Sequence, residues 1–332
     1  MIFVTGGTGL VGAHVLLKLS QKGKCFKALK RPLSSLDVCK KIFTYYNADE
    51  LFKAIKWVDG DLGDIVSLQQ GMEDCDFLLH CAAVVSFSSF DTDILKKVNI
   101  EGTANVMNVA LSCGIKKAGY VSSISALGSN ASIIDEDCYF QPGKLISNYA
   151  FSKYFAEQEV WRASAEGLKV IIINPSVILG PGDWTKGSSQ IFEKIYNGLK
   201  FYSEGSTGYV DVQDVADALL QLLFSNIKNE RFIINGINLK YRDCFDRIAS
   251  ALNRPKASIR LTPFLKEVAW RAEAIKSLIT GKRPLITKET ANNSMTKKLY
   301  SSQKIEKALQ FKFTDINLTI KKYADWFIAD QV

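Results

Sequence analysis

Histidine and proline are scarce in this sequence, and long apolar runs are missing. The 332 residues include 2 histidines, too few for histidine-based hydrolysis or a zinc site, so we expect no metal. With 7 prolines and 22 glycines, collagen-like and linker-rich chains are excluded. The longest apolar stretches, such as residues 170–173 and 219–224, are far shorter than the ~20 residues of a membrane span. We therefore expect a globular protein without a membrane segment.

Paired cysteines and a leader segment are missing as well. The 7 cysteines are odd in number and never form a C-x-x-C pair, so we expect reduced thiols. From Met1 the chain runs directly into the apolar run at residues 2–5, with no basic region, apolar stretch and cleavage site before it. Both features predict a cytoplasmic protein.

The formal net charge of +8 permits an acidic partner. The lysines are spread as doublets, such as Lys40-Lys41 and Lys321-Lys322, without the interleaved aromatic residues of a single-strand binding surface. We therefore expect a solvated surface, or steering of an anionic substrate or cofactor, and neither a nucleic-acid nor a membrane partner.

Short apolar runs alternate with longer segments through the first half of the chain. Strands are expected at residues 2–5, 26–30, 56–58, 77–80, 117–122 and 168–174, with crossover helices such as 11–22 between them. This order predicts an α/β fold, a Rossmann-type doubly wound parallel sheet. Beyond residue 175, helical segments at 214–224 and 264–280 dominate, which predicts a smaller, mostly helical C-terminal substrate lobe. We place the dinucleotide-binding domain at residues 1–176 and 210–236, and the substrate-binding lobe at 177–209 and 237–332.

A glycine-rich turn joins the first strand to the first helix. Gly6 permits the tight turn, Gly9 lets the backbone approach a diphosphate, and Gly12 lets the helix pack close to the strand. The helix N-terminus adds unpaired amides and partial positive charge. The turn therefore predicts a dinucleotide site made by Thr5, Gly6, Gly7, Thr8, Gly9, Leu10, Val11 and Gly12.

The second strand ends in Lys30-Arg31, where an NAD site usually places an acidic residue for the ribose. These side chains put positive charge where the 2′-phosphate of NADP would sit, and Ser34 and Ser35 are extra donors. We predict NADP as the cofactor. The alternative is that the basic side chains point to solvent and NAD is also accepted.

Two further strand ends face the expected cofactor. After the third strand, Asp61 is placed to accept from the adenine amine and Leu62 to cover the ring. After the fourth strand, Cys81, Ala82 and Ala83 are small enough to leave room for the cofactor. For His14 and His80 we expect packing in the core or at the cofactor edge.

Tyr149 and Lys153 are four residues apart in a helical segment, so they share one face. A nearby ammonium favours the phenolate, which lowers the pKa of a phenol that works as a proton donor. Ser123 closes the strand between the glycine turn and this pair, which makes the three residues a candidate catalytic group.

Taken together, these motifs resemble an extended short-chain dehydrogenase/reductase of the NAD-dependent epimerase/dehydratase superfamily. The T-G-x-x-G-x-x-G turn, the H-x-A-A strand end, S-S-x-x-A-x-G, Y-x-x-x-K and N-P occur in that family's order over residues 2–182. The resemblance implies that Ser123 polarises a carbonyl and that Tyr149 is the acid/base. It implies that Lys153 holds the nicotinamide ribose and depresses the tyrosine pKa. Asn99 matches an asparagine of the central helix, with a catalytic or a purely structural role.

The resemblance also implies cofactor contacts by Asn174, Pro175 and Val177, and a homodimer through paired helices. The I-N-P-x-x-x-x-G-P stretch at residues 173–181 is similar to that of dihydroflavonol and cinnamoyl-CoA reductases. Nucleotide-sugar epimerases more often carry R-x-x-N-V-Y-G-P there and an acidic residue at the second strand.

We therefore predict an NADP(H)-dependent oxidoreductase that reduces a ketone or aldehyde to an alcohol, or the reverse, by hydride transfer with Tyr149 as acid/base. The first alternative is a nucleotide-sugar epimerase or dehydratase with tightly bound NAD, and the second is a cofactor-sensing binding protein without turnover. An apolar, aromatic lining would suit a small molecule with a hydrophobic body. Ordinary packing between the lobes is the alternative for each lining candidate. The candidates are Ser125, Val84, Ser86, Phe87 and Trp184, then Phe90, Phe140, Phe201 and Tyr202.

Overall fold

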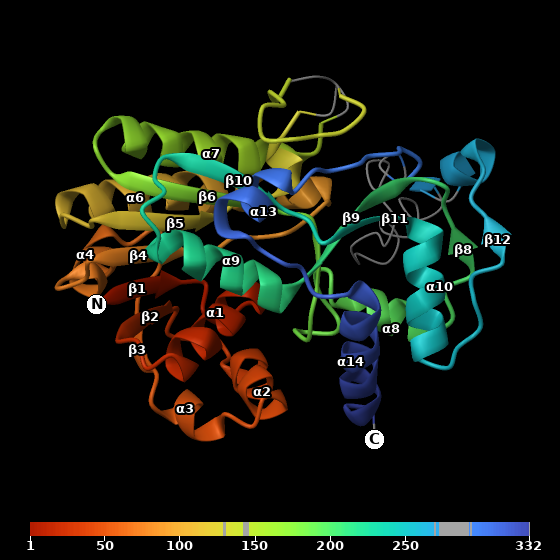
Figure 1. The fold of residues 1–332 in the computed structure, drawn as a ribbon, viewed down its shortest axis with the longest axis horizontal. Coiled ribbons are helices and arrows are strands. Elements are labelled where there is room, and N and C mark those ends of the chain that lie inside the picture. Colours follow the sequence, from red (N-terminus) through yellow and green to blue (C-terminus); the bar gives the residue numbers. More distant parts are fainter. Residues whose placement is uncertain (129–130, 142–145, 269, 272–291, 293, 332) are drawn as a thin grey trace.

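A seven-stranded sheet runs through the larger part of the molecule (Figure 1). The computed structural model describes residues 1–332 except 129–130, 142–145, 269, 272–291, 293 and 332. The strand order is β10-β6-β5-β4-β1-β2-β3, and every neighbouring pair is parallel. The strands are β1 (Ile2–Thr5), β2 (Phe26–Lys30), β3 (Lys56–Asp59), β4 (Phe77–His80), β5 (Lys117–Val121), β6 (Lys169–Pro175) and β10 (Glu230–Ile234). The predicted α/β Rossmann-type sheet is confirmed.

Helices cover both faces of this sheet, as Figure 1 shows. On one face lie α1 (Leu10–Gln21), α2 (Asp37–Tyr45), α3 (Asp49–Lys53) and α9 (Val212–Phe224). On the other lie α4 (Ile65–Met72), α6 (Gly102–Ser112) and α7 (Asn148–Ala165). Successive strand residues point to opposite faces. For this reason Val4 and Leu79 belong to the first core, while their neighbours Phe3 and Leu78 belong to the second.

The segment between β4 and α6 is a run of short helical turns. It comprises the 3-10 turn η1 (Ser89–Asp91), α5 (Thr92–Leu95) and the π-helix η2 (Lys96–Glu101). Asn99 lies in the π-helical part and is buried. π-helical turns inside longer helices are rare, and those that occur often lie at functional sites.

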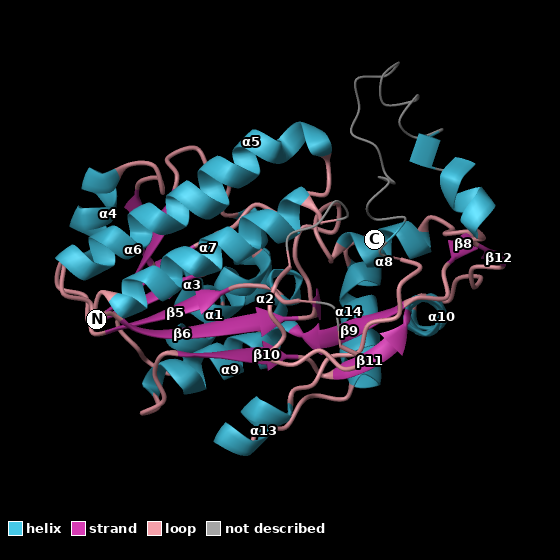
Figure 2. Ribbon diagram, turned by 90° about the horizontal axis from the view of Figure 1, so that it is seen from above, coloured by secondary structure: helices cyan, strands magenta, loops and turns pink. Residues whose placement is uncertain are grey.

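The second lobe holds small sheets in addition to the helices that the sequence predicts. Besides α8 (Gln190–Tyr196), α10 (Tyr241–Ala251) and α14 (Ile316–Ala329), it holds a three-stranded and a two-stranded sheet. The first contains β7 (Val177–Leu179), β9 (Ser206–Asp211) and β11 (Ile237–Lys240), and the second pairs β8 (Phe201–Tyr202) with β12 (Ile259–Arg260). Figure 2 shows the three-stranded sheet beyond the ends of β6 and β10. These strands are too short for a clear alternation of apolar residues. The expected helix at 264–280 lies largely outside the described residues.

The chain returns to the sheet domain near its end, which corrects the predicted boundary at residue 237. Helix α13 (Gln303–Leu309) packs beside β10, and Ile305 and Phe311 are part of the core under α1 and α9. Lys304 forms an ion pair with Glu230 at 3.0 Å. Local pattern carries no signal for this docking, because it joins residues that are distant along the chain. Among the helices of the described part of the chain, none has the length and apolarity needed to cross a membrane.

Ile305→Ala tests whether α13 is part of the sheet domain. Ile305 is fully buried, so the truncation leaves a cavity and should lower the free energy of unfolding by about 2–5 kcal/mol. Lys307→Ala, on the exposed side of the same helix, should change it by no more than about 0.5 kcal/mol. Chemical denaturation of both variants measures the difference, and equal stabilities would show that α13 is not docked.

Candidate active site

The glycine turn between β1 and α1 is built for a close backbone approach. Gly6 has φ +74°, and a Cβ there would overlap the backbone of Ala82. A Cβ on Gly12 would overlap the carbonyl oxygen of Gly6. Gly9 differs, because a Cβ there would come no nearer to the protein than 3.5 Å, at the carbonyl oxygen of Gly6. Close packing explains why glycine is required at positions 6 and 12. Packing does not require glycine at position 9, and the space beside Gly9 is open to a ligand.

The N-terminus of α1 offers donors to that ligand. Gly9 is the N-cap, and the first turn has neither a side-chain cap nor an acidic residue. Within the described structure, the amides of Leu10 and Val11 have no hydrogen-bond partner. Such an end attracts phosphate groups. The side chain of Leu10 packs toward Gly180 and Gly182 of the second lobe, so its part in the predicted site is through its backbone. These residues fit the pyrophosphate of a dinucleotide.

Thr5 is held beneath the turn by a histidine. Its hydroxyl lies 2.6 Å from Nδ1 of His80, whose Nε2 lies 3.0 Å from the hydroxyl of Thr103. Burial lowers the pKa of His80 to about 3, so the ring is neutral. His14 is likewise buried, with a pKa lowered to about 3 by the loss of solvent. Both histidines pack as the sequence predicts. The Thr5 side chain links β1 to β4 through its contact with His80.

At the end of β2, the two predicted cations have different surroundings. Lys30 forms an ion pair with Asp59 of the neighbouring strand β3. Arg31 is exposed, and among the residues that the structure describes it has no ion-pair partner. Ser35 donates to the carboxylate of Asp37 at 2.6 Å. Arg31 is therefore the cation available at this strand end, whereas the charge of Lys30 is already matched by Asp59.

The other predicted cofactor residues line the ends of β3 and β4. Asp61 accepts from the amide of Gly63 at 2.8 Å, so its carboxylate shapes the turn. Leu62 is buried in the second core. Cys81 donates its amide to the carbonyl of Thr5 at 3.2 Å, and burial raises the pKa of its thiol to about 12. Ala82 and Ala83 follow, with Ala82 against Gly6 and Ala83 exposed.

The structure brings Tyr149 and Ser123 together. Ser147 caps α7 by accepting from the amide of Ala150 at 2.8 Å, which places Tyr149 in the first turn. The Ser123 side chain lies near the phenol of Tyr149 and acts to lower its pKa. Burial is the larger influence and raises the pKa of Tyr149 above its ordinary value. The phenol is therefore protonated at neutral pH.

Lys153 lies one turn further along α7 and is fully buried. Its ammonium donates to the Tyr120 hydroxyl at 2.7 Å and to the carbonyl of Val121 at 2.9 Å. Loss of solvent lowers the pKa of Lys153 to about 7. The sequence predicts that Lys153 depresses the pKa of Tyr149, and this is wrong for the arrangement seen. Burial dominates at the phenol, and the ammonium is directed to Tyr120 of β5.

Asn99 joins the loop after β4 to α7. Its Oδ1 accepts from the amide of Val84 at 2.8 Å, and its Nδ2 donates to the carbonyl of Val84 at 3.0 Å and to Ser152 Oγ at 2.9 Å. Ser152 directly precedes Lys153. Of the two roles left open by the sequence, these contacts are those of a residue that joins helix and loop.

The substrate candidates separate into three groups. Near Tyr149, the ring of Phe87 makes an edge contact at 5.4 Å, and the amide of Ser125 donates to Ser123 Oγ at 3.1 Å. The hydroxyl of Ser86 donates to Asp91 at 2.6 Å. Trp184 is a correction, since its ring packs in the core of the second lobe and its indole donates to Asp330 at 2.6 Å.

The remaining aromatic candidates lie in three separate parts of the chain, which are a loop, β8 and η1. Phe140 stacks on Tyr154 of α7 with ring centroids 4.2 Å apart. Phe201 and Tyr202 form β8, where Arg242 lies over the Tyr202 ring at 4.4 Å. Phe90 lies in η1 and is exposed. Phe140 therefore contacts α7, the helix that carries Tyr149.

Sequence reasoning missed a buried carboxylate behind these residues. Glu157 accepts from Ser122 Oγ at 2.6 Å and from Asn174 Nδ2 at 2.9 Å. Asn174 also donates to the carbonyl of Ser123 at 3.0 Å, so this predicted cofactor residue holds the backbone of Ser123. Pro175 ends β6, and Val177 begins β7 opposite Tyr209. The signal for Glu157 was its spacing of four residues from Lys153.

Comparison with known proteins agrees with this geometry. A model of the NAD dependent epimerase/dehydratase family matches residues 2–235. The chain belongs to this family. The match spans all seven strands of the large sheet and each of the residues Ser123, Tyr149 and Lys153.

Named relatives in this epimerase/dehydratase family include reductases. A putative dihydroflavonol 4-reductase from Synechocystis sp. is 30% identical over 336 residues, which cover 98% of this chain and 94% of that protein. Cinnamoyl-CoA reductase 1 from Petunia hybrida is 27% identical over 67% of this chain and 68% of that protein. The crystal structure of gox2253 has 29% identity and a TM-score of 0.82, with 99% of this chain and 98% of that chain covered. The protein is an NAD(P)-dependent enzyme of the oxidoreductase/epimerase type.

Two glycine substitutions separate folding from cofactor binding. Gly12→Ala forces a methyl group against the Gly6 carbonyl and should destabilise the fold by about 2 kcal/mol or more.

In Gly9→Ala the new methyl group meets only an ordinary contact, so the melting temperature of the variant should stay within about 2 °C of that of the parent protein. Its methyl group fills the open space, so NADPH affinity should fall at least about tenfold. Thermal melts and fluorescence titration measure both effects. Unchanged NADPH affinity in Gly9→Ala would contradict a site at this turn.

Proposed function

We propose that this protein is an NADP(H)-dependent oxidoreductase that interconverts a ketone or aldehyde and the corresponding alcohol. The observation that carries the proposal is the placement of the protonated Tyr149 phenol near Ser123, with its ring 5.4 Å from that of the partly exposed Phe87. A carbonyl oxygen placed between these hydroxyls would accept from both. The named reductases among its relatives support the same reaction type.

The roles of the residues follow from their protonation and contacts. A bound nicotinamide supplies the hydride when the cofactor is present. Tyr149 holds a proton at neutral pH and delivers it to the oxygen on which negative charge develops. Ser123 donates a hydrogen bond to the same oxygen and stabilises that charge. Lys153, whose pKa is lowered to about 7, is placed to return a proton to the Tyr149 phenolate or to bind the ribose of the cofactor.

The chain favours a substrate with an apolar body. Phe87 contacts Tyr149 and is 39% exposed, while Val85 and Phe90 on the same segment are 54% and 71% exposed. Exposed apolar side chains beside a reacting group favour hydrophobic or aromatic ligands. The proposed partner is therefore a small carbonyl compound or alcohol with such a body.

Tyr149→Phe tests the proton transfer. Loss of the hydroxyl should reduce kcat by about 10²–10⁴-fold, the usual contribution of a positioned acid. The measurement is NADPH absorbance with a panel of aromatic and aliphatic aldehydes and ketones. Tyr139→Phe is the matched control, because Tyr139 is 82% exposed and should keep full activity. Full turnover by Tyr149→Phe on any substrate of the panel would overturn the proposed chemistry.

Arg31→Ala tests the choice of cofactor. Arg31 is exposed at the β2 end and forms no ion pair with the described residues, and a charge-assisted bond to the 2′-phosphate contributes about 1.5–3 kcal/mol. The KM for NADPH should therefore rise by about 10- to 100-fold, while the KM for NADH stays the same. Lys30→Ala should have a smaller effect, since Asp59 already partners Lys30. Equal changes for both cofactors would exclude recognition of the 2′-phosphate by Arg31.

The alternative of a nucleotide-sugar epimerase or dehydratase predicts a different behaviour of the purified protein. Such an enzyme would retain NAD through purification and show no net change in NADPH absorbance during turnover. Cofactor extraction followed by mass spectrometry distinguishes the two functions before a substrate is known.

A further inference from the structure

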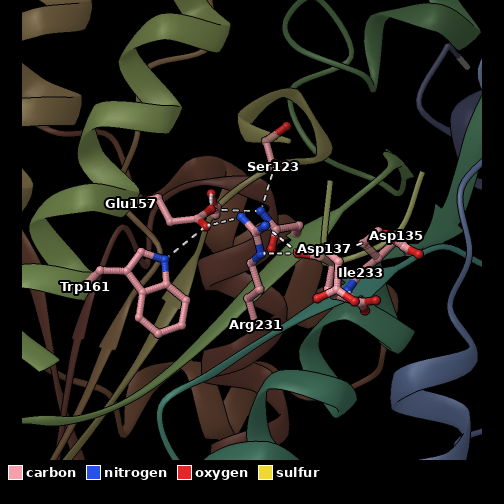
Figure 3. Close-up of polar contacts among 10 residues, drawn as sticks. Ser123, Asp135, Asp137, Glu157, Trp161, Arg231 and Ile233 are labelled. Atoms are coloured by element: carbon pink, nitrogen blue, oxygen red, sulfur yellow. Dashed lines mark hydrogen bonds and ion pairs between the residues drawn. The ribbon is translucent and has the colours of Figure 1, made fainter. Parts of the chain in front are cut away.

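A buried charge pair lies directly behind the proposed catalytic group. Glu157 is 1% exposed and stands four residues after Lys153, on the same face of α7. Its carboxylate forms an ion pair with Arg231 of β10 at 3.2 Å. Figure 3 shows Glu157 turned toward Arg231, with Trp161 on one side and Ser123 nearby. An ionised carboxylate at such depth is costly unless it is paired and hydrogen-bonded.

The carboxylate of Glu157 organises the end of β5. Oε2 accepts from Ser122 Oγ at 2.6 Å and from Asn174 Nδ2 at 2.9 Å. The same Nδ2 donates to the carbonyl of Ser123 at 3.0 Å. Glu157 thus reaches the backbone of Ser123 through one intervening amide, and the side chain of its neighbour Ser122 directly.

Glu157 also acts on Lys153 through its charge. Burial works against the charged form of Lys153, and the negative charge of Glu157 is the largest influence that opposes this effect. In the low dielectric of the interior, an opposite charge one helical turn away is weakly screened. Without Glu157, the ammonium would lose its main electrostatic support.

We propose that Glu157 is a positioning residue, whose buried carboxylate fixes the chain at Ser122 and Ser123 and keeps the ammonium of Lys153 charged. The inference rests on the proposed carbonyl reduction, because Ser123 and Lys153 work in that reaction. Glu157 itself touches neither substrate nor cofactor in this role.

Arg231 has a separate, structural task. Its guanidinium donates to the backbone carbonyl of Glu136 through Nε at 2.8 Å and also through a second nitrogen. The carboxylate of Glu136 accepts from the amide of Ile233 at 2.8 Å. Arg231 thereby joins the edge strand β10 to the loop at Glu136, and its removal would leave the bonds of Glu157 to Ser122 and Asn174 in place.

Other titratable groups also face Lys153, from three elements. They are His80 and Cys81 at the end of β4, Tyr120 of β5, and Tyr149 and Glu157 of α7. His80 is neutral, and burial raises the pKa values of Cys81, Tyr120 and Tyr149, so these four groups carry no charge near neutral pH. Glu157 is the one carboxylate of this set.

Glu157→Gln removes the charge and keeps the size of the side chain. The protein is labelled with an isotope at lysine Cε, and NMR follows the Lys153 signal with pH in the absence of cofactor. Lys153→Met assigns the signal. The apparent pKa of Lys153 should fall by about one unit or more in Glu157→Gln. Glu159→Gln is the matched control, since it removes a carboxylate of the same helix that pairs with Arg162 toward solvent, and it should leave the value unchanged.

Arg231→Gln separates positioning from simple stabilisation. It breaks the same ion pair, so it should lower the melting temperature, but it should not lower the pKa of Lys153. In activity measurements, the high-pH limb of kcat/KM should move to lower pH in Glu157→Gln and stay in place in Arg231→Gln. An unchanged Lys153 titration in Glu157→Gln, or equal downward shifts in both variants, would overturn the proposal. The NMR result does not depend on the substrate, so it stands apart from a failure of the proposed reaction.

Discussion

Parallel pairing of β1 with both β2 and β4 determines where the functional groups of this protein lie. Because all strands of the sheet run the same way, their carboxyl ends meet at one edge, and the chain order reverses there between β1 and β4. The glycine turn, the small residues after β4 and Ser123 after β5 are all brought to that edge. Gly6 touches the backbone of Ala82, so the turn and the neighbouring strand end share one surface.

Helix α7 carries more buried polar groups than its sequence suggests. Tyr149, Lys153 and Glu157 follow at intervals of four residues, and each is nine-tenths or more buried. Lys153 bonds to Tyr120 and Glu157 pairs with Arg231, while Ser123 lies near the phenol of Tyr149. Buried groups of this kind are tolerated only when they are satisfied. The consequence is a site whose protonation states are set by burial and by a few fixed contacts.

Much of the fold and part of the site could be predicted from local sequence. The strands at 2–5 and 77–80 match the prediction, because short apolar runs between turns determine them. The glycine turn has the expected geometry, since Gly6 and Gly12 are required by contacts within one supersecondary unit. Tyr149 and Lys153 share a helix face, which spacing alone indicates.

Features that depend on contacts between distant residues were not predicted. The pairing of Lys30 with Asp59 requires knowledge of the neighbouring strand, and that of Trp184 with Asp330 joins residues 146 positions apart. The raised pKa of Tyr149 was missed because burial is a property of the folded chain, whereas the sequence shows only that an ammonium is near.

Helix α13 has one consequence beyond stability. β10 is the last strand of the large sheet, and an edge strand offers unpaired backbone groups to any other extended chain. α13 packs beside this strand, with Lys304 paired to Glu230 and lying over the ring of Phe232. By packing beside β10, α13 therefore limits the access of another extended chain to this edge of the sheet.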